Sequence, residues 1–178
     1  MDTYRLREYA IAHVAKKLSG LSKTGMMKAM YLLQQVYKVP LNYEFSIYTY
    51  GPYDVEVLTY TDIAERDGLV RIVQYDLAEG SVGYKIYAKS SKLDDNFPKE
   101  CTDAIDEIVK NFQDYTARKW ELTATIVYVY NAHIMNGTSM DKSTLCNRVY
   151  ELKPHFDKSD IRTEYDKLER IGFLECPS

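Results

Sequence analysis

The side chains best suited to acid–base, nucleophilic or metal chemistry are few and scattered in this sequence. The histidines are His13, His133 and His155, and the cysteines are Cys101, Cys146 and Cys176. No C-x-x-C pair occurs and no histidine lies near a cysteine at a ligand spacing, so the pattern does not predict a zinc site. The sequence also lacks G-x-S-x-G, H-E-x-x-H, G-x-x-x-x-G-K-[ST] and G-x-G-x-x-G. We interpret the acidic pair Asp94-Asp95 as a solvated loop. We therefore expect no catalytic residues, no metal ion and no cofactor, in a protein that is not an enzyme.

The sequence carries no sign of export or of membrane insertion. It begins MDTYRLREYA, without an apolar segment behind the charges, and no run approaches 18 apolar residues. The odd number and wide spacing of the cysteines suit unpaired thiols in a reducing compartment better than a disulfide framework. The expected location is the cytoplasm, away from membranes.

Tyrosine is the residue type present in excess. The chain of 178 residues holds 17 tyrosines, and a tyrosine combines a large ring with a polar tip, which suits both half-buried positions and interfaces. A dense group surrounds a Gly-Pro step in the stretch FSIYTYGPYDVEVL, residues 45–58. This group comprises Tyr48, Tyr50, Gly51, Pro52 and Tyr53. It is either a structural corner or an aromatic contact surface for a partner protein.

The pattern before the Gly-Pro step favours a strand. Residues 44–50 alternate with a period of two, which places Tyr48 and Tyr50 on the face opposite the more apolar one. An antiparallel sheet can leave one face in water. We expect at least two of the rings of Tyr48, Tyr50 and Tyr53 to belong to a shallow docking surface. The competing expectation is that later helices cover the rings.

The pattern after the step favours a helix. Gly51 can adopt any backbone angle, and Pro52 has a fixed φ and no N–H, as is typical of a first helical residue. Asp54 and Glu56 would then fall in the first turn, where the helix dipole favours negative charge. The helix is expected over residues 53–67, so the Gly-Pro step is explained by a sharp strand-to-helix corner.

Residues 1–97 are expected to form a winged-helix-like subdomain with a small antiparallel sheet. Apolar spacing predicts a helix over 4–18, and Ser22 is expected to cap a second one. After the third helix, the arms 69–76 and 83–88 flank a Glu-Gly-Ser turn and predict a β-hairpin, which corresponds to the wing.

The remainder, residues 98–178, is expected to be a helical subdomain packed on the first. Apolar residues recur at helical spacing over 98–116, 119–136, 141–152 and 157–171. A short extended piece is expected at Phe173-Leu174, after Gly172. Tight corners between the last helices resemble a helix-turn-helix core. The predicted fold class is therefore α+β and mostly helical.

The N-terminal half resembles a known family. The run from LSKTGMMKAMYLLQQVY through YEFSIYTYGPYDVEVLTYTDIAERDGLV resembles the YwgA-like proteins and the related Panacea, or SocA-like, domain. The C-terminal ELKPHF and LERIGFL are similar to the YwgA-like tail, so the resemblance covers most of the chain. Its most distinctive part is the Tyr-Gly-Pro-Tyr corner, Tyr50 to Tyr53.

This resemblance implies a protein-binding role. Panacea-domain relatives are associated with toxin neutralisation and protease adaptor function, and the resemblance therefore implies a non-enzymatic module of the antitoxin, adaptor or phage-defence-related type. The functional role that the resemblance implies extends only to the matching corner, which is Tyr50, Gly51, Pro52 and Tyr53.

Charge bears on the alternative, a winged-helix DNA-binding transcriptional regulator. Winged helices often place their last helix in the major groove, but residues 53–67 carry five acidic side chains against one arginine. A net charge of −4 opposes binding to a polyanion, and the sequence pI is about 5.7. Only residues 1–38 are clearly basic, with seven Lys or Arg against two acidic residues. We therefore expect a protein partner, basic because of the acidic helix, with nucleic acid disfavoured.

Overall fold

The structure, a computed structural model, describes residues 1–89, 93, 96–137 and 140–174. Within these ranges the helices are α1 (Thr3–Lys17), α2 (Lys23–Gln35), α3 (Val55–Arg66), α4 (Lys99–Phe112), α5 (Ala117–Met135), α6 (Lys142–Leu152) and α7 (Lys158–Arg170). The strands are β1 (Leu21–Ser22), β2 (Ser46–Tyr48), β3 (Gly51–Tyr53), β4 (Val70–Asp76) and β5 (Val82–Ala88). The predicted class, mostly helical α+β, is confirmed.

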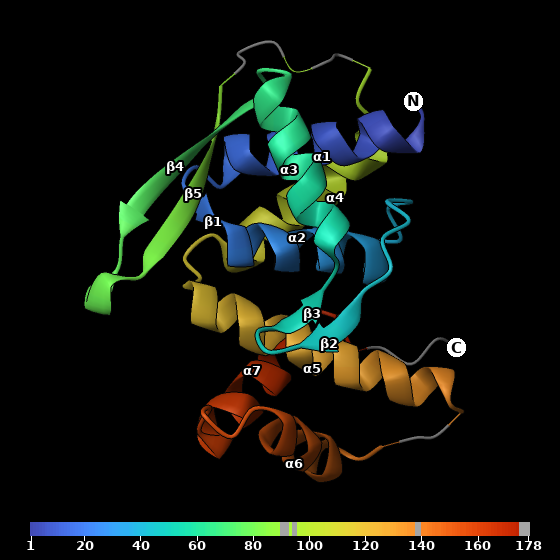
Figure 1. Ribbon diagram of the computed structural model, residues 1–178. Coiled ribbons are helices and arrows are strands. Elements are labelled where there is room, and N and C mark those ends of the chain that lie inside the picture. The colour runs from blue at the N-terminus through green and yellow to red at the C-terminus, as the bar shows by residue number, and fades with distance from the viewer. Residues whose placement is uncertain (90–92, 94–95, 138–139, 175–178) are drawn as a thin grey trace.

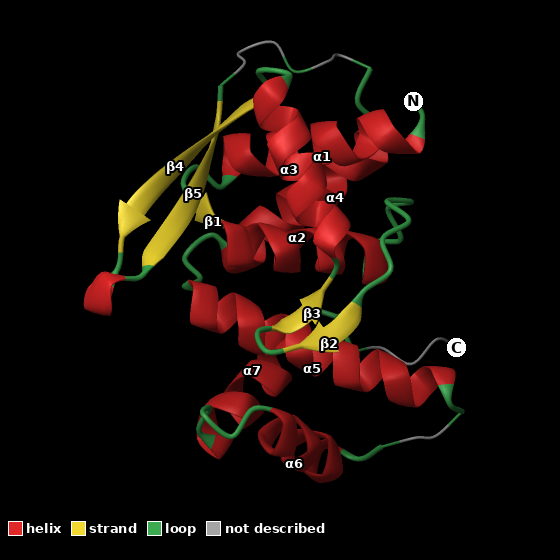
Figure 2. Cartoon of the chain, viewed as in Figure 1, coloured by secondary structure: helices red, strands yellow, loops and turns green. Residues whose placement is uncertain are grey.

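Two small antiparallel sheets complete the fold (Figure 2). One has the strand order β1-β5-β4, and its long β4–β5 hairpin projects to one side of the helices. The other is the short pair β2–β3. In chain order the first half comprises α1, β1, α2, the β2–β3 pair, α3 and the β4–β5 hairpin. We call the β4–β5 hairpin the wing.

Side-chain caps start several helices where the sequence predicts them. The Ser22 hydroxyl accepts a hydrogen bond from the Gly25 amide over 3.0 Å, and the Asp141 carboxylate accepts one from the Thr144 amide over 3.0 Å. Each cap accepts a hydrogen bond from a backbone amide that has no partner within the first turn of the helix.

The corner around Pro52 differs from the prediction. Pro52 does not begin a helix; it lies in β3, opposite Ile47 of β2, and the helix begins later, after its cap Asp54. Proline is tolerated in this position because a two-stranded sheet has only edge strands. The predicted strand is also shorter, so Tyr50 lies in the turn between β2 and β3. We call residues 46–53 the tyrosine hairpin.

Helix α5 occupies the centre of the molecule. It packs against α2 on one side and against α6 and α7 on the other (Figure 1). The buried apolar side chains form one continuous core that spans both predicted subdomains. The loop predicted to separate them contains Asp94-Asp95, which lies outside the described residues. Past it, Phe97 stacks on His13 of α1, with ring centroids 4.1 Å apart.

The C-terminal end of the described chain is a turn. The sequence predicts an extended piece at Phe173-Leu174, but both residues are buried in a turn that follows α7. The Phe173 amide donates to the carbonyl of Leu168, and its ring contacts Phe112 with centroids 5.5 Å apart. Contact with the core, rather than strand pairing, therefore fixes this end.

Candidate functional site

Two tyrosine rings of the hairpin are exposed on the surface. Tyr48 is 66% and Tyr50 is 65% exposed, whereas Tyr53 is half-buried and contacts Tyr48 with ring centroids 5.6 Å apart. Later helices therefore do not cover Tyr48 and Tyr50, and the docking role expected for these rings stays a prediction. Tyr48 projects from β2 and Tyr50 from the turn, so the two rings come from a single short element.

The opposite side of the tyrosine hairpin lies directly on α5. Gly51 and Pro52 are both buried, and Gly51 has a φ of +86°. A Cβ atom built on Gly51 would lie 2.9 Å from Oγ1 of Thr125 on α5. Glycine is therefore required here both by its backbone angle and by the close approach of the two elements.

Two buried lysines hold the carbonyl groups of the hairpin. Lys28 of α2 donates a hydrogen bond to the carbonyl oxygen of Pro52 over 2.7 Å. Lys153, just after α6, donates to the carbonyl oxygens of Tyr48 and Thr49, the former over 3.1 Å. Both lysines are almost completely buried. The backbone of the hairpin is thus fixed from two sides, which limits the positions that the exposed rings can adopt.

A single buried carboxylate, Glu121 of α5, accompanies these two ammonium groups. Its Oε1 lies 3.2 Å from Nζ of Lys153 and 3.4 Å from Nε2 of His155. Neither contact has hydrogen-bond geometry, so Oε1 of Glu121 has no hydrogen-bond partner in the described part of the chain. The interaction is therefore an ion pair without an aligned hydrogen bond.

Burial of these charges has a clear electrostatic effect on Lys28. The pKa of Lys28 is lowered from 10.5 to about 8, mainly by desolvation, which Glu121 opposes and to which Lys153 adds. Two buried cations against one buried carboxylate leave an excess of positive charge beneath the hairpin. Because buried ion pairs add little net stability, the main effect of these charges is to position the backbone of the hairpin.

A depression adjoins the exposed rings. It has a cavity volume of about 550 Å³ and is lined mainly by Ile47, Tyr48, Tyr50, Leu152 and His155. Leu152 at the end of α6 is itself 39% exposed. We call this depression together with the rings of Tyr48 and Tyr50 the docking surface.

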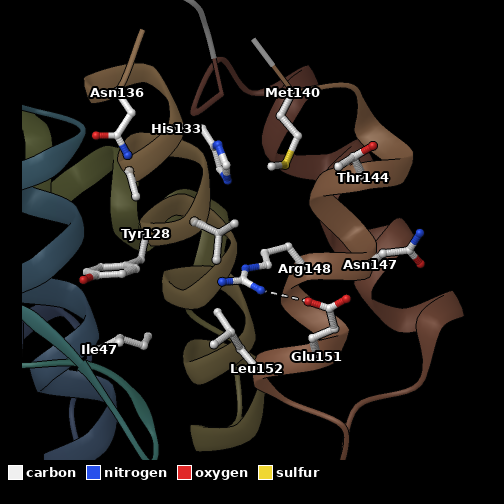
Figure 3. Close-up of a pocket in the computed structure, with 12 residues that line it drawn as sticks. Ile47, Tyr128, His133, Asn136, Met140, Thr144, Asn147, Arg148, Glu151 and Leu152 are labelled. Carbon is white, nitrogen blue, oxygen red and sulfur yellow. Dashed lines mark hydrogen bonds and ion pairs between the residues drawn. The ribbon is translucent and has the colours of Figure 1, made fainter. Parts of the chain in front are cut away.

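The docking surface continues into a groove between α5 and α6. This groove, of about 680 Å³, shares Ile47 and Leu152 with the depression and extends to Met140. Figure 3 shows Arg148 and Glu151 of α6 paired along its wall, with the Arg148 side chain directed toward Tyr128. The groove therefore combines apolar lining residues with polar ones and a charged pair, as binding sites for protein segments often do.

The acidic residues of α3 are largely engaged within the chain. Glu56 pairs with buried Arg7 over 2.9 Å, and Asp62 lies 3.6 Å from Lys23. Glu65 accepts a hydrogen bond from the amide of Ile72 over 2.6 Å. These contacts reduce the negative field that the sequence offers to a basic partner.

The residues considered for catalysis are placed apart. His13 lies on α1 against Phe97, His133 lines the α5–α6 groove, and His155 follows α6. Burial raises the pKa of both the Cys101 and the Cys146 thiols, which makes them less reactive at neutral pH. Cys176 lies outside the described residues. Over the described ranges, no three His, Cys, Asp or Glu side chains gather as a metal site would need.

Sequence reasoning missed the buried charges that hold the hairpin. Lys28 and Arg7 were counted with the basic surface of the first two helices, but both are buried. A signal was present at Lys28, a lone charge inside the apolar stretch MMKAMYLL. Glu121 and Lys153 offered no such local signal, because their partners lie far away in sequence.

Comparison with known proteins identifies no relative of this chain. No family model, no curated protein and no solved structure matches the chain. None of the described helices is long and apolar enough to cross a membrane.

Proposed function

We propose that this chain is a non-enzymatic protein-binding module that holds a partner protein at the docking surface. The observation that carries the proposal is the pair of exposed rings, Tyr48 and Tyr50, on a hairpin whose backbone is held by two buried lysines. Two rings that are each about two-thirds exposed contribute little to the stability of the chain itself. Tyrosine is, however, among the residue types that contribute most to binding energy at protein interfaces.

The rigidity of the hairpin supports the proposal. A partner that binds pre-positioned rings loses less conformational entropy than one that must first order a flexible loop. The apolar depression beside the rings and the adjoining α5–α6 groove offer surface that an apolar partner segment can fill. Affinity would then come mainly from aromatic and apolar contacts.

The charge of the partner is a weaker element of the proposal. The net charge of α3 favours a basic partner, as the sequence predicts, and complementary charge would speed its association. Because Glu56 and Asp62 already pair with Arg7 and Lys23, we expect charge to contribute less than the rings do.

The type of module follows from the family resemblance. The Tyr-Gly-Pro-Tyr corner that resembles the Panacea domain is the part of the chain that forms the tyrosine hairpin. We therefore propose an antitoxin, adaptor or phage-defence-related role, in which the partner is a protein whose activity or fate changes on binding.

A second candidate function is DNA-binding regulation. It is favoured by the element order of the first half and by the wing. It is disfavoured by α3, whose acidic side chains would face the phosphates in the usual winged-helix docking mode. Nanomolar, sequence-selective binding of duplex DNA at physiological salt would promote this candidate above the first.

A quantitative affinity enrichment tests the main proposal. The wild-type chain, the Tyr48→Ala/Tyr50→Ala double variant and the control Tyr4→Ala are each used as bait in an extract of the source cells. Tyr4 is a suitable control because it is 68% exposed on α1, away from the docking surface. We expect a specific protein to be retained by the wild type and by Tyr4→Ala, and to be lost from the double variant. Equal retention by all three baits would reject the docking surface.

A further inference from the structure

The outer face of the wing carries a second arrangement of aromatic and charged side chains. In the β4–β5 register, Arg71 lies opposite Tyr87 and Tyr75 lies opposite Gly83. Because side chains alternate between the two faces of a strand, Arg71, Tyr75, Lys85 and Tyr87 all belong to the same face. Ile86, which belongs to the other face, is fully buried.

Cations lie over both rings on this face. The Nζ atom of Lys85 is 5.0 Å from the ring centroid of Tyr75, and the guanidinium of Arg71 is 5.7 Å from that of Tyr87. The two cationic side chains are exposed, whereas the rings are half-buried. Lys85 and Arg71 can therefore turn toward a bound anion while the rings stay in place.

Glycines fix the orientation of the two rings. A Cβ atom on Gly83 would lie 2.5 Å from the Tyr75 ring, and one on Gly20 would lie 3.2 Å from the Tyr87 ring. Each ring thus lies close against bare backbone, so the face is a fixed aromatic surface.

A concave site lies between this face and the turn that connects α4 to α5. Its cavity volume is about 440 Å³, and its lining includes Lys17, Gly20, Tyr75, Lys85 and Tyr115. We call it the wing pocket. Figure 1 shows the β4–β5 hairpin, which supplies Tyr75 and Lys85, to the side of the helices and apart from the β2–β3 pair.

Two further lysines lie over the ring of Tyr115, which lines the wing pocket. The ammonium groups of Lys119 and Lys167 lie 4.9 Å and 4.2 Å from its ring centroid. The Tyr115 hydroxyl donates to the buried carboxylate of Glu164, over 2.9 Å, and accepts from Lys167 over 2.6 Å. The ring is therefore held from both α5 and α7.

The balance of charge around the wing pocket is positive. Lys17 and Lys85 line it, and Lys119 and Lys167 lie over the ring of its lining residue Tyr115. Against them stand Asp106, which pairs with Lys17, the lining residue Asp114, and Glu164. This local excess contrasts with the net charge of −3 of the whole chain.

We infer that the wing pocket binds single-stranded nucleic acid. Proteins that bind single strands combine aromatic side chains, on which bases stack, with a positive groove that follows the phosphates. The wing pocket has both components, because its lining combines the rings of Tyr75 and Tyr115 with the ammonium group of Lys85. The acidic α3 is not involved, so its charge does not oppose this mode.

Fluorescence anisotropy with the full chain tests this inference. The probes are a labelled oligothymidylate of about 15 nucleotides and a duplex of the same length. We expect the single strand to bind more tightly than the duplex, and its affinity to fall about tenfold between roughly 50 and 200 mM salt. The variant Lys85→Glu should lower the affinity at least about tenfold, and Tyr75→Leu should lower it by a similar factor through loss of stacking.

Two controls separate this surface from other causes. Lys99→Glu makes the same charge change at an exposed site at the first residue of α4, remote from the wing pocket, and should leave the affinity within about twofold of the wild type. Tyr48→Ala/Tyr50→Ala should also leave it unchanged, so failure of the docking proposal is distinguished from failure of this one. A melting curve verifies that each variant is folded.

Several results would overturn the inference. These are absence of binding at the lower salt concentration, duplex affinity equal to that for the single strand, and an equal loss with Lys99→Glu. Displacement of the oligonucleotide by polyglutamate at the same charge concentration would assign the wing pocket to acidic polypeptides instead.

Discussion

Lys28 Nζ donates a hydrogen bond to the carbonyl oxygen of Pro52 over 2.7 Å, and both residues are buried. The contact joins α2 to β3 across 24 residues of sequence. It places an ammonium group beneath the hairpin that exposes Tyr48 and Tyr50. The exposed surface and the buried charges are therefore two sides of the same hairpin.

The first prediction concerns the balance of charge beneath the tyrosine hairpin. Glu121→Gln leaves the ammonium groups of Lys28 and Lys153 buried without a carboxylate, and we expect it to lower the free energy of unfolding by about 3–5 kcal/mol. Lys28→Met removes one hydrogen bond but also the excess positive charge, so we expect a loss below ~2 kcal/mol. Urea unfolding measures both.

The double variant Glu121→Gln/Lys28→Met provides the control. Because it removes one of the two cations that Glu121→Gln leaves without a carboxylate, its loss should be smaller than the sum of the two single losses by at least about 1 kcal/mol. Strict additivity would show that the two side chains do not share one electrostatic network.

The second prediction separates backbone strain from close packing at Gly51. Gly51→Ala and Gly68→Ala both place a Cβ on a residue with positive φ, +86° and +80°. At Gly68 the added carbon has no neighbour within 4 Å, whereas at Gly51 it would lie 2.9 Å from Thr125 Oγ1. We expect a cost of about 1 kcal/mol at Gly68 and at least about 2 kcal/mol at Gly51, measured by thermal or urea unfolding. Equal costs would show that the hairpin can move away from α5.

Local sequence patterns predicted much of the fold and pointed to the exposed tyrosines, but not to the buried charges beneath them. Ser22 and Asp141 cap their helices as expected, because a cap depends on residues only three positions apart. Pro52 was assigned to a helix because its fixed φ suits a first turn, and nothing local indicated pairing with Ile47.

The buried charges could not be predicted for a different reason. The ammonium group of Lys153 contacts the carbonyl oxygen of Tyr48, more than 100 residues earlier in the chain. Lys153 becomes buried only when α5 and α6 pack together, which the residues next to it in sequence do not indicate. The exposure of Tyr48 and Tyr50 was predictable in part, because the period of two placed Tyr48 opposite the core. Tyr50 is exposed for another reason, since it lies in the turn.

The third prediction concerns acid stability and His13. Burial, with a further contribution from Lys16 and Lys17, lowers the pKa of His13 from 6.5 to about 4. Between these two values the unfolded chain binds a proton at this side chain and the folded chain does not, so the free energy of unfolding rises with pH through the window. We expect this contribution to stability to be lost as the pH falls from 6.5 to 4.

His13→Phe tests the assignment, because it retains a ring against Phe97 but does not titrate. The urea midpoint of this variant should decrease less than that of the wild type between neutral pH and pH 4. An identical pH dependence in both proteins would assign the acid sensitivity to other groups.

The fourth prediction concerns the stability of the docking surface itself. Because Tyr48 and Tyr50 are about two-thirds exposed, replacing both by alanine should lower the free energy of unfolding by no more than ~1.5 kcal/mol, most of it from the Tyr48–Tyr53 contact. If the rings were buried, each truncation would cost about 3–5 kcal/mol. A melting curve of the double variant decides between the two.

The most direct measurement for the docking proposal is site-specific photo-crosslinking in the source cells. A photoreactive phenylalanine analogue replaces Tyr50 in one protein and Tyr4, the matched exposed control, in another. We predict that position 50 forms a covalent adduct with a single partner protein, that position 4 does not, and that excess unlabelled wild-type chain prevents the adduct. Crosslinking to the same proteins with equal yield from both positions, or no adduct at position 50, would contradict the docking surface.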